Sequence, residues 1–544
     1  MKNNIQALVI ISSVIILVFG KLKNTFYQQD EWYSLGLIFA EGVESVFSGI
    51  SGPSDLLFIK GRLIANLVYY FFASSYPLEN TQLAIFAIIL HIVATFLVYI
   101  LIRKFIKNDF FAILGALFFA VNAVSHSAVT WSAIAITAVG STIFVLMGIF
   151  FFIKYLTESK KKWLICTGAM IYLSLWFKET GLHMFLFLPL ATLLFKKYSL
   201  IPFVKTYWAF FLPFLMIVFF RVVELNLRQT TSNLYITGLN ENFFSTIFLR
   251  GVLYPLTSFS LMFIPGDHFL NFAREVLREI YPFFSSAGNN ILVAQTVILD
   301  LLSVILTFVI LVTIYFLLQK EKKETKKIIY FWIIFSFMSF LPYIVLSKDF
   351  SYLEGRYYYL SVVGGAVLLS WFCKRLWEVF GPKMFYLIVL PLCISYLMFH
   401  VSVVQDSIAE RVRLSNIQKD FMIQVKTLIP TLDNEKNVFY VTSDQDFWAE
   451  GNKLPFQQGS GYTLMILYYN TGKIPKEFLK AQSLLEVGFL YDIGSQGYKE
   501  SRGLGFGYFF DKEELDKNVK LYNLLEDSII RLKYDSDTNK LEME

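Results

Sequence analysis

The stretch Leu83–Ile102, LAIFAIILHIVATFLVYILI, decides the fold class of this chain. As a helix with a rise of about 1.5 Å per residue, it is long enough to cross a hydrocarbon layer of about 30 Å. Arg103, Lys104 and Lys107 follow it, and basic residues beside a span mark its cytoplasmic end. The stretch therefore predicts a transmembrane helix that ends in the cytoplasm.

The composition extends this prediction to the whole chain. Of 544 residues, 56% are hydrophobic and 18% aromatic, and the mean hydropathy is +0.55, which is more apolar surface than one soluble core buries. The net charge of +6 does not indicate a nucleic-acid partner, because the basic residues form short clusters between apolar runs. Three cysteines, Cys166, Cys373 and Cys393, lie in apolar runs without metal-ligand spacing and are interpreted as packing residues. We predict a mostly α-helical, polytopic membrane protein.

Further apolar runs alternate with basic clusters. Residues 5–20 are predicted to be an uncleaved first span with a cytoplasmic N-terminus, because no small-residue cleavage site follows them. The other predicted spans are 83–102, 110–125, 135–153, 163–177, 183–195, 201–220, 291–318, 329–347, 357–372 and 383–404. The total is about eleven spans, and the odd number places the C-terminal segment outside the cytoplasm.

Two loops of the predicted membrane domain, residues 1–404, are long. The first external loop, 21–82, contains a short apolar helix at 63–73 that is expected to lie at the membrane interface. In the second, 221–290, the apolar run 243–265 is interrupted by Arg250 and Pro255, and the run 269–284 carries charges at helical spacing. Both runs are expected to form helices on the outer face.

Residues 405–544 are predicted to form an external α+β domain. An amphipathic helix is expected over 407–428, and strand-like runs are Val438–Thr442 and Phe489–Tyr491. The segment Ile529–Glu544 is expected to form a hairpin with a turn at Asp535-Ser536-Asp537.

The first candidate site is the stretch Gln28–Ser34, QQDEWYS, just after the first span. It places two adjacent carboxylates, Asp30 and Glu31, at a membrane surface where charged groups are costly to dehydrate. The functional hypothesis is a catalytic pair, and the alternative is a solvated acidic loop.

The second candidate is Lys178-Glu179-Thr180-Gly181, which lies between two spans that are too close for an ordinary loop. Charges near bilayer depth pair with each other or line a cavity. The functional hypothesis is a lysine that binds an anionic headgroup, and the alternative is a Lys–Glu pair that only extends to the interface.

The third candidate is Arg356, in Glu354-Gly355-Arg356-Tyr357-Tyr358-Tyr359. Its planar guanidinium matches two phosphate oxygens, so phosphate binding is preferred over interfacial anchoring. The three tyrosines are interpreted as members of an aromatic belt.

Two histidines are interpreted with these candidates. His91 lies in the middle of a span and is interpreted as a packed, hydrogen-bonded residue, whereas His126, at an outer end, fits either packing or binding.

The predicted topology places most of the charged residues of the apolar region on one outer face, which a single outward-facing cleft would explain. These residues are Asp30, Glu31, Arg62, His126, Lys178, Glu179, His183 and those of 348–356. The patterns HExxH, GxxxxGK[ST] and GxGxxG do not occur in the sequence, which argues against a zinc protease, a P-loop pump and a nucleotide-binding fold.

The order of these motifs resembles the GT-C membrane glycosyltransferases over roughly residues 1–400. The similarity is greatest to the protein O-mannosyltransferases, the transmembrane/tetratricopeptide-repeat mannosyltransferases and their bacterial relatives. The motifs are Asp30-Glu31, Arg62, Leu90-His91, Phe119-Ala120-Val121-Asn122 to His126, Lys178 to Gly181, and Glu354 to Tyr357. The chain departs from the family in lacking the tetratricopeptide repeats, since residues 405–544 stand in their place.

The resemblance implies inverting transfer of a sugar from a polyprenyl-phosphate donor to a protein, lipid or glycan acceptor on the outer face. It makes Asp30 the catalytic carboxylate, with Glu31 in support. It assigns the donor phosphate to Lys178, Arg356 and Arg62, and the substrate to His126 and Glu179. Independently of the resemblance, carbohydrate stacks on exposed aromatic rings, so Trp32 and Tyr33, which lie beside the acids, are candidate sugar-binding residues. An acidic site also accepts Mg²⁺ or Mn²⁺, so a metal at Asp30 is left open.

Two alternatives remain. A transporter or lipid-linked sugar flippase would also carry intramembrane charges, but such folds show internal repeats and charges near the midplane, and neither pattern is present in the sequence. A non-catalytic membrane assembly protein is the third reading. The many lysines in short loops favour a bacterial inner membrane as the location.

Overall fold

The computed structural model describes most of the chain. The described residues are 2–28, 30–50, 52, 59, 61–227, 243–280, 293–346, 353–432, 438–443, 460–474, 476–479, 507–509, 512–523 and 525–544. They form two compact units. Unit 1 comprises Met1–Gly20, Gly49–Ala65 and Ile85–Asp406, and unit 2 comprises Lys21–Ser48, Asn66–Ala84 and Ser407–Glu544.

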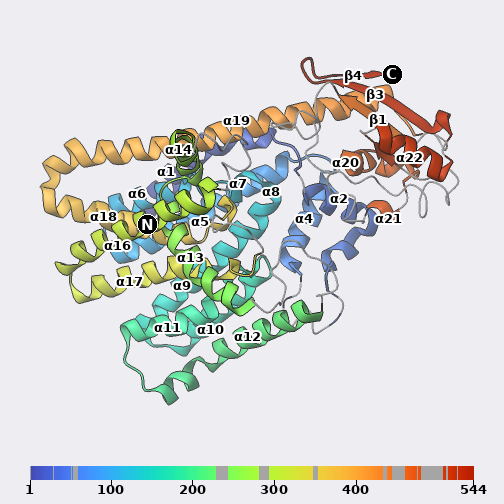
Figure 1. Ribbon diagram of the computed structural model, residues 1–544. Coiled ribbons are helices and arrows are strands. Elements are labelled where there is room, and N and C mark those ends of the chain that lie inside the picture. The colour runs from blue at the N-terminus through green and yellow to red at the C-terminus, as the bar shows by residue number, and fades with distance from the viewer. Residues whose placement is uncertain are drawn as a thin grey trace. The chain divides into compact units, whose positions relative to one another are not determined.

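Unit 1 is helical (Figure 1). Its longer helices are α1 (Lys2–Phe19), α5 (Thr81–Ile106), α6 (Asp109–Ala120), α9 (Gly140–Glu158), α10 (Lys161–Leu175), α11 (Met184–Phe195), α12 (Leu200–Leu227), α13 (Phe243–Leu261), α14 (Gly266–Ile280), α16 (Asp300–Gln319), α17 (Lys323–Met338) and α18 (Ser361–Met384). Its short turns are α7 (Ser127–Thr130), α8 (Ser132–Ile134), η3 (Ala135–Val139), η4 (Glu179–Gly181), η5 (Ala294–Leu299), η6 (Leu341–Tyr343), η7 (Gly355–Tyr357) and η8 (Phe385–Val389).

Among the described residues, six helical segments are long and apolar enough to cross a membrane. They are Asn3–Asn24, Thr81–Ile106, Ser132–Glu158, Leu200–Phe220, Asp300–Gln319 and Ser361–Leu428. The chain is therefore a multi-pass membrane protein. The count of about eleven spans stays a prediction, because helices such as α6 and α11, of 12 residues each, are shorter than a full crossing.

Serine and threonine hydroxyls join the helices of unit 1. Ser370 Oγ donates to the carbonyl oxygen of Phe111 at 2.7 Å, which links α18 to α6. Thr307 Oγ1 donates to the carbonyl oxygen of Leu256 at 2.6 Å, which links α16 to α13. Because lipid is as apolar as a leucine side chain, such bonds and close packing contribute much of the association of helices in a membrane.

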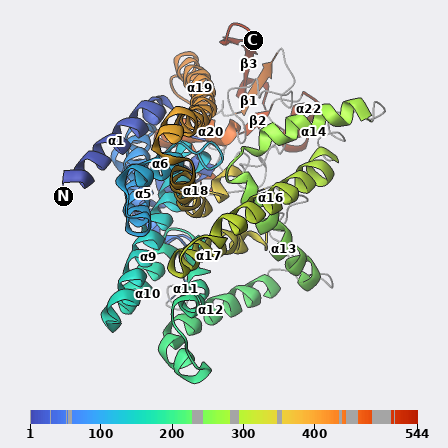
Figure 2. The ribbon, with the colours of Figure 1, turned by 90° about the vertical axis from the view of Figure 1, so that its left-hand side faces the viewer.

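The helices predicted at 243–265 and 269–284 are present in the described residues as α13 and α14. Helices α13 and α14 meet at an angle of 97° (Figure 2). The apolar side of α14 packs through Leu270, Ala273 and Leu277 against Ala294. Their location on the outer face stays a prediction.

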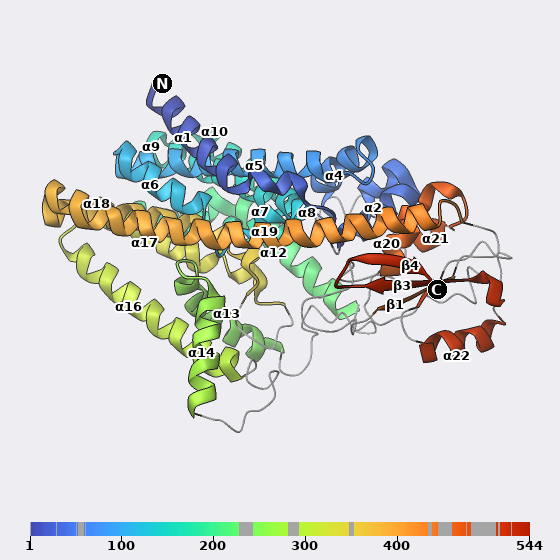
Figure 3. The ribbon, with the colours of Figure 1, turned by 90° about the horizontal axis from the view of Figure 1, so that it is seen from above.

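Unit 2 contains a four-stranded sheet with the order β2-β1-β3-β4. Strands β1 (Val438–Ser443), β2 (Gly507–Phe509) and β3 (Ile529–Asp535) are parallel, whereas β4 (Lys540–Met543) pairs antiparallel with β3 (Figure 3). The strand predicted at Val438–Thr442 and the C-terminal hairpin are confirmed. In the predicted turn, Asp535 Oδ1 accepts from the amides of Asp537 and Thr538. The predicted strand Phe489–Tyr491 lies outside the described residues.

Helices pack on the sheet of unit 2. Leu515 of α22 (Lys512–Tyr522) packs against Val438 and Phe509. Phe439 faces Tyr468, which follows α20 (Ser460–Leu467), with ring centres 6.2 Å apart.

The long helix α19 (Leu390–Leu428) corrects one prediction. The sequence suggested that the last span ends at residue 404 and that a separate amphipathic helix begins at 407. The structure has one continuous helix there (Figure 3). The reason is local, since residues 405–407 contain neither glycine nor proline to end a helix.

The first long loop differs from its predicted placement. Residues 21–82 are predicted to belong to the membrane domain, but the stretches Lys21–Ser48 and Asn66–Ala84 pack within unit 2. Helix α2 (Asp30–Glu41) contacts α20 and α21 (Lys476–Leu479). The rings of Phe39 and Tyr469 are stacked with centres 3.9 Å apart. The predicted helix at 63–73 is confirmed as α4 (Leu63–Ser75).

Candidate functional site

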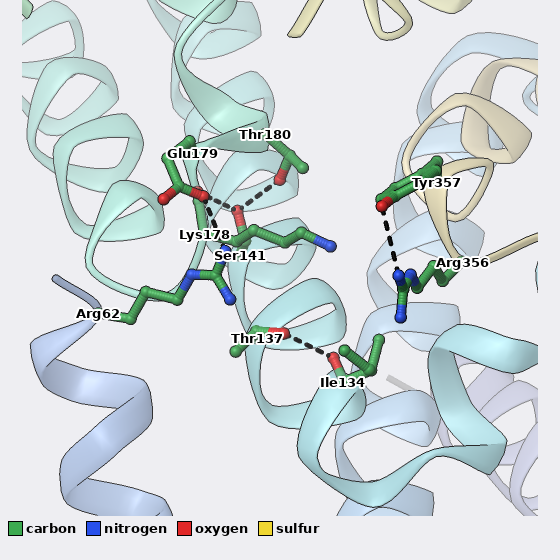
Figure 4. A network of polar contacts seen from close by, with 9 residues as sticks. All are labelled: Arg62, Ile134, Thr137, Ser141, Lys178, Glu179, Thr180, Arg356 and Tyr357. Carbon is green, nitrogen blue, oxygen red and sulfur yellow. Dashed lines mark hydrogen bonds and ion pairs between the residues drawn. The ribbon is translucent and has the colours of Figure 1, made fainter. Parts of the chain in front are cut away.

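Three cations from three separate parts of the sequence come together in unit 1. Arg62 precedes α4, Lys178 follows α10, and Arg356 lies in η7. The Lys178 side chain extends toward the space between Arg62 on one side and Arg356 with Tyr357 on the other (Figure 4). We call Arg62, Lys178, Glu179, Glu354, Arg356 and Tyr357 the charged cluster.

Lys178 is the buried member of the charged cluster. The residue is 7% exposed, and its Nζ lies 5.4 Å from the centre of the Tyr357 ring. Within the described part of the chain, this ammonium makes neither a hydrogen bond nor an ion pair. The pKa of Lys178 is lowered to about 7, chiefly by burial and then by repulsion from Arg62 and Arg356, which Glu179 and Glu354 offset only in part. The site therefore favours an additional negative charge beside Lys178.

The two arginines already have carboxylate partners. Arg62 Nη2 lies 3.3 Å from Glu179 Oε2, and both side chains are nearly half-exposed, so water screens this pair. Arg356 Nη2 lies 2.7 Å from Glu354 Oε2. The Arg356 guanidinium also lies 5.2 Å from the ring centres of both Trp131 and Tyr357. These contacts hold the guanidinium groups in position around Lys178.

The turn that carries Lys178 is held by side chains of α9. Ser141 Oγ donates to the carbonyl oxygen of Lys178 at 3.3 Å and lies 3.1 Å from Thr180 Oγ1. The Lys178 amide donates to the carbonyl oxygen of Ser174 at 3.1 Å, which ends α10. Ser141 follows the π-helical turn η3, a local widening that is frequent near functional sites.

The turn that carries Arg356 packs against the turn of His126. A Cβ placed on Gly355 would lie 2.3 Å from the carbonyl oxygen of Val124. Asn122 shapes the facing turn, because its Oδ1 accepts from the amides of Val124 and Ser125. His126 precedes α7, which contacts η7, and its Nδ1 lies 3.5 Å from Thr130 Oγ1. The structure thus brings the segments of His126 and Arg356 together.

Replacing Gly355 by alanine is expected to impair the site more than replacing Gly181. The added methyl group at Gly355 meets backbone, whereas at Gly181 it meets the Ser174 hydroxyl, 2.1 Å away, which can be removed. We expect Gly355→Ala to cost roughly 1–3 kcal/mol of folding free energy. Ser174→Ala should partly rescue Gly181→Ala, as measured by the thermal unfolding midpoint. An equal loss for both glycine variants, without rescue, would contradict the packing argument.

The acidic pair lies in unit 2. The side chain of Asp30 is outside the described part of the structure, although its backbone begins α2. Glu31 is 1% exposed, and its Oε2 accepts from the amide of Gln28 at 2.6 Å. This is the bond that the glutamate of a capping box makes. Arg411 Nη1 donates to Gln28 Oε1 at 2.6 Å, so α19 holds the same turn. Glu31 therefore contacts the turn that precedes α2, and its charge also acts on the buried Arg411.

Trp32 corrects another expectation. Its position beside the acids predicts a sugar-binding surface, but Trp32 is 1% exposed, and its ring packs edge-on against Phe26 and Tyr27. A ring enclosed in this way has no free face for a sugar, so Trp32 is a packing residue. Tyr33 is half-buried and stays a candidate.

Some partners were not found from the sequence alone. Trp131 and Ser141 are adjacent to the charged cluster only through tertiary packing, and neither belongs to a charged motif. Glu354 was quoted as part of a motif but was given no role, although the spacing of Glu354 and Arg356 fits an ion pair.

His91 is a packed residue, as predicted. Its Nδ1 lies 2.8 Å from Tyr359 Oη, and its Nε2 lies 2.8 Å from the carbonyl oxygen of Ala120. Over the described residues there is no group of three or more His, Cys, Asp or Glu side chains that could hold a metal ion. The metal suggested for Asp30 stays an open prediction.

Comparisons with known proteins give the following findings. No protein-family model matches the sequence, and no curated protein matches it. One similar solved structure is archaeal oligosaccharyltransferase AglB from Archaeoglobus fulgidus in complex with an inhibitory peptide and a dolichol-phosphate. Its TM-score is 0.41, with 13% identity over 98% of this chain and 69% of that chain. A second is the Archaeoglobus fulgidus oligosaccharyltransferase in the apo form, with a TM-score of 0.38 and 12% identity over 86% of this chain and 65% of that chain. Similarity this low identifies no family.

Proposed function

We propose that the protein is a membrane glycosyltransferase that moves a sugar from a polyprenyl-phosphate donor to an acceptor. The observation that carries the proposal is the buried ammonium of Lys178, which lies between two arginines and makes no ion pair with any described residue of this multi-pass membrane protein. An uncompensated buried charge is costly, so its presence favours a ligand of opposite charge. A lipid phosphate supplies that charge from within the membrane.

The reaction uses this arrangement as follows. The acceptor hydroxyl attacks the anomeric carbon, the bond between that carbon and the phosphate oxygen breaks, and the lipid phosphate leaves with the bonding electrons. Negative charge therefore grows on the phosphate as the bond breaks. Lys178 and Arg356 are proposed to stabilise that charge, and cations fixed beforehand are the most effective arrangement for doing so. Attack from the side opposite the leaving group inverts the anomeric carbon.

The remaining residues take supporting roles. Arg62 is proposed to hold the phosphate side of the site together with Glu179, its ion-pair partner. Asp30 is proposed to take the proton of the acceptor hydroxyl, because that step needs a carboxylate within hydrogen-bond reach. Glu31 positions the backbone of Asp30, and Tyr33 and His126 are proposed to contact substrate.

The decisive test is release of sugar from a panel of radiolabelled polyprenyl-phosphate sugars by the purified protein with an acceptor extract. Release by the native protein, lost in Lys178→Met, would support the proposal and name the donor. No release from any donor by folded protein would contradict it. Flux of a lipid-linked sugar in proteoliposomes would then favour the flippase.

The pH dependence of donor use gives a further prediction. The pKa of Lys178 lies near 7, so the ammonium form that attracts phosphate is present below this pH and is lost above it. We expect kcat/KM for the donor to fall as the pH rises through about 7 to 8. Lys178→Arg should remove this fall, because the guanidinium stays charged. The same decline in both proteins would contradict the assignment.

A further inference from the structure

Lysine side chains from three helices of unit 1 gather on two aromatic rings, Phe150 of α9 and Trp163 at the start of α10. Lys104 of α5 and Lys154 of α9 each place Nζ 5.1 Å from the centre of the Phe150 ring. Lys154 Nζ also lies 4.3 Å from the Trp163 ring, and Lys162 Nζ lies 4.9 Å from it. We call Lys104, Lys154 and Lys162 the lysine cluster.

The lysine cluster carries three positive charges, and Glu158 attracts Lys104 and Lys154 without forming an ion pair with either. The carboxylate in the turn between α9 and α10 is Glu158, and it already binds Lys160 Nζ at 3.2 Å and accepts from Trp163 Nε1 at 2.9 Å. Within the part of the chain that the structure describes, none of the three clustered lysines makes an ion pair. Attraction to the ring faces holds these ammonium groups near one another despite their mutual repulsion. An anion between them would remove that repulsion.

The lysine cluster is distinct from the charged cluster of Lys178. It lies at the first turn of α10, whereas Lys178 follows the last turn. Because α10 has 15 residues, the two ends are separated by roughly 20 Å at about 1.5 Å per residue. A ligand of the lysine cluster is therefore not the donor phosphate of the proposed reaction.

The position of the lysine cluster indicates what kind of anion is available. Lys104 lies in the last turns of α5 and Lys154 near the end of α9, and both helices belong to segments long enough to cross a membrane. Lysine, tryptophan and tyrosine at such ends lie at the level of the lipid headgroups. Ile165, about one turn after Lys162 in α10, is 73% exposed, which suits contact with an acyl chain. Charge and apolar surface thus lie together as a phospholipid presents them.

We propose that Lys104, Lys154 and Lys162 bind the phosphate of an anionic phospholipid of the surrounding membrane. Basic residues beside a span attract anionic lipids through their headgroup charge. Here the Phe150 ring holds the ammonium groups of both Lys104 and Lys154, so the site is defined by geometry and is more than a diffuse positive charge.

The test is lipid binding by the full-length protein in detergent, followed by native mass spectrometry. The probes are phosphatidylglycerol and, for comparison, the zwitterionic phosphatidylcholine. The native protein should retain phosphatidylglycerol preferentially, and the double variant Lys104→Gln, Lys154→Gln should bind it at least tenfold more weakly. The control, Lys161→Gln with Lys197→Gln, removes the same charge from two exposed lysines and should stay within twofold of the native protein.

Three results would overturn the proposal. The first is equal binding of both lipids by the native protein. The second is binding of phosphatidylglycerol by the cluster variant that is as strong as binding by the native protein. The third is an equal loss of binding in the cluster variant and the control variant, which would show that only net charge matters. Thermal unfolding of each variant would establish that it is folded before the comparison.

Discussion

Replacing Lys178 by methionine is expected to make the protein more stable and much less active. Methionine has a similar length but no charge, so the buried ammonium and its desolvation cost disappear. An unsatisfied buried group costs about 1–3 kcal/mol, which corresponds to a rise of roughly 1–3 °C in the thermal midpoint for a chain of this size. Losing one preorganised charge at the leaving phosphate should lower kcat/KM by about 10²- to 10³-fold.

The opposite directions of these two effects separate a functional role from a structural one. If Lys178 stabilised the fold, Lys178→Met would be less stable than the native protein. If Lys178 serves ligand binding, it lowers the stability of the native protein and contributes to its activity. The matched control is Lys107→Met, which removes an exposed lysine and should change neither quantity. A lower midpoint in Lys178→Met, or unchanged activity, would contradict the proposed role.

The difference in stability between Lys178→Met and the native protein depends on pH, because folding lowers the pKa of Lys178. In the folded protein the pKa of Lys178 is about 7, and the reference value for an exposed lysine is 10.5. Below pH 7 the side chain is charged in both states, so the folded state bears the full cost of burying the charge. Above pH 7 the folded state loses the proton, and the cost fades as the pH approaches 10.5. The stabilisation by Lys178→Met should therefore be largest below pH 7.

The membrane helices were predictable, whereas their number of crossings was not. Apolar runs such as 83–102 and 201–220 lie within helices, because a long run without charges has few alternatives in a membrane. Runs such as 110–125 gave a helix of only 12 residues, α6, which ends at Ala120 before Asn122 shapes the following turn. Hydropathy alone does not register such an end.

The charged residues of the candidate site were predictable, but their surroundings were not. Arg62, Lys178 and Arg356 stand out in sequence because cations are rare among apolar runs. That they converge, and that Trp131 and Ser141 hold two of their segments, depends on packing between distant segments. Trp32 was misjudged for the same reason. An aromatic residue beside two acids suggests a sugar-binding surface, but Phe26 and Tyr27 enclose its ring.

The acidic pair gives the second prediction with a large effect. Asp30→Asn is expected to lower kcat by about 10²- to 10⁴-fold, because an amide cannot take the proton of the acceptor hydroxyl. Donor binding, measured by the KM for the donor, should stay near the native value. The thermal midpoint should fall by no more than the small contribution of an acid at a helix N-terminus, about 0.3–1 kcal/mol.

Glu31 provides the comparison that makes this result interpretable. Its carboxylate is buried and accepts from the Gln28 amide, so Glu31→Ala should cost about 0.5–2 kcal/mol of stability, as loss of a helix cap does. Because Asp30 begins the same helix, kcat should also fall in Glu31→Ala. Glu31→Gln should restore both in part, since its amide oxygen can accept the same bond but the attraction to the buried Arg411 is lost. Asp30→Asn should show no such coupling between stability and turnover. If instead Glu31→Gln lost turnover while remaining stable, Glu31 would be the proton acceptor, and Asp30 would be the residue that only begins the helix.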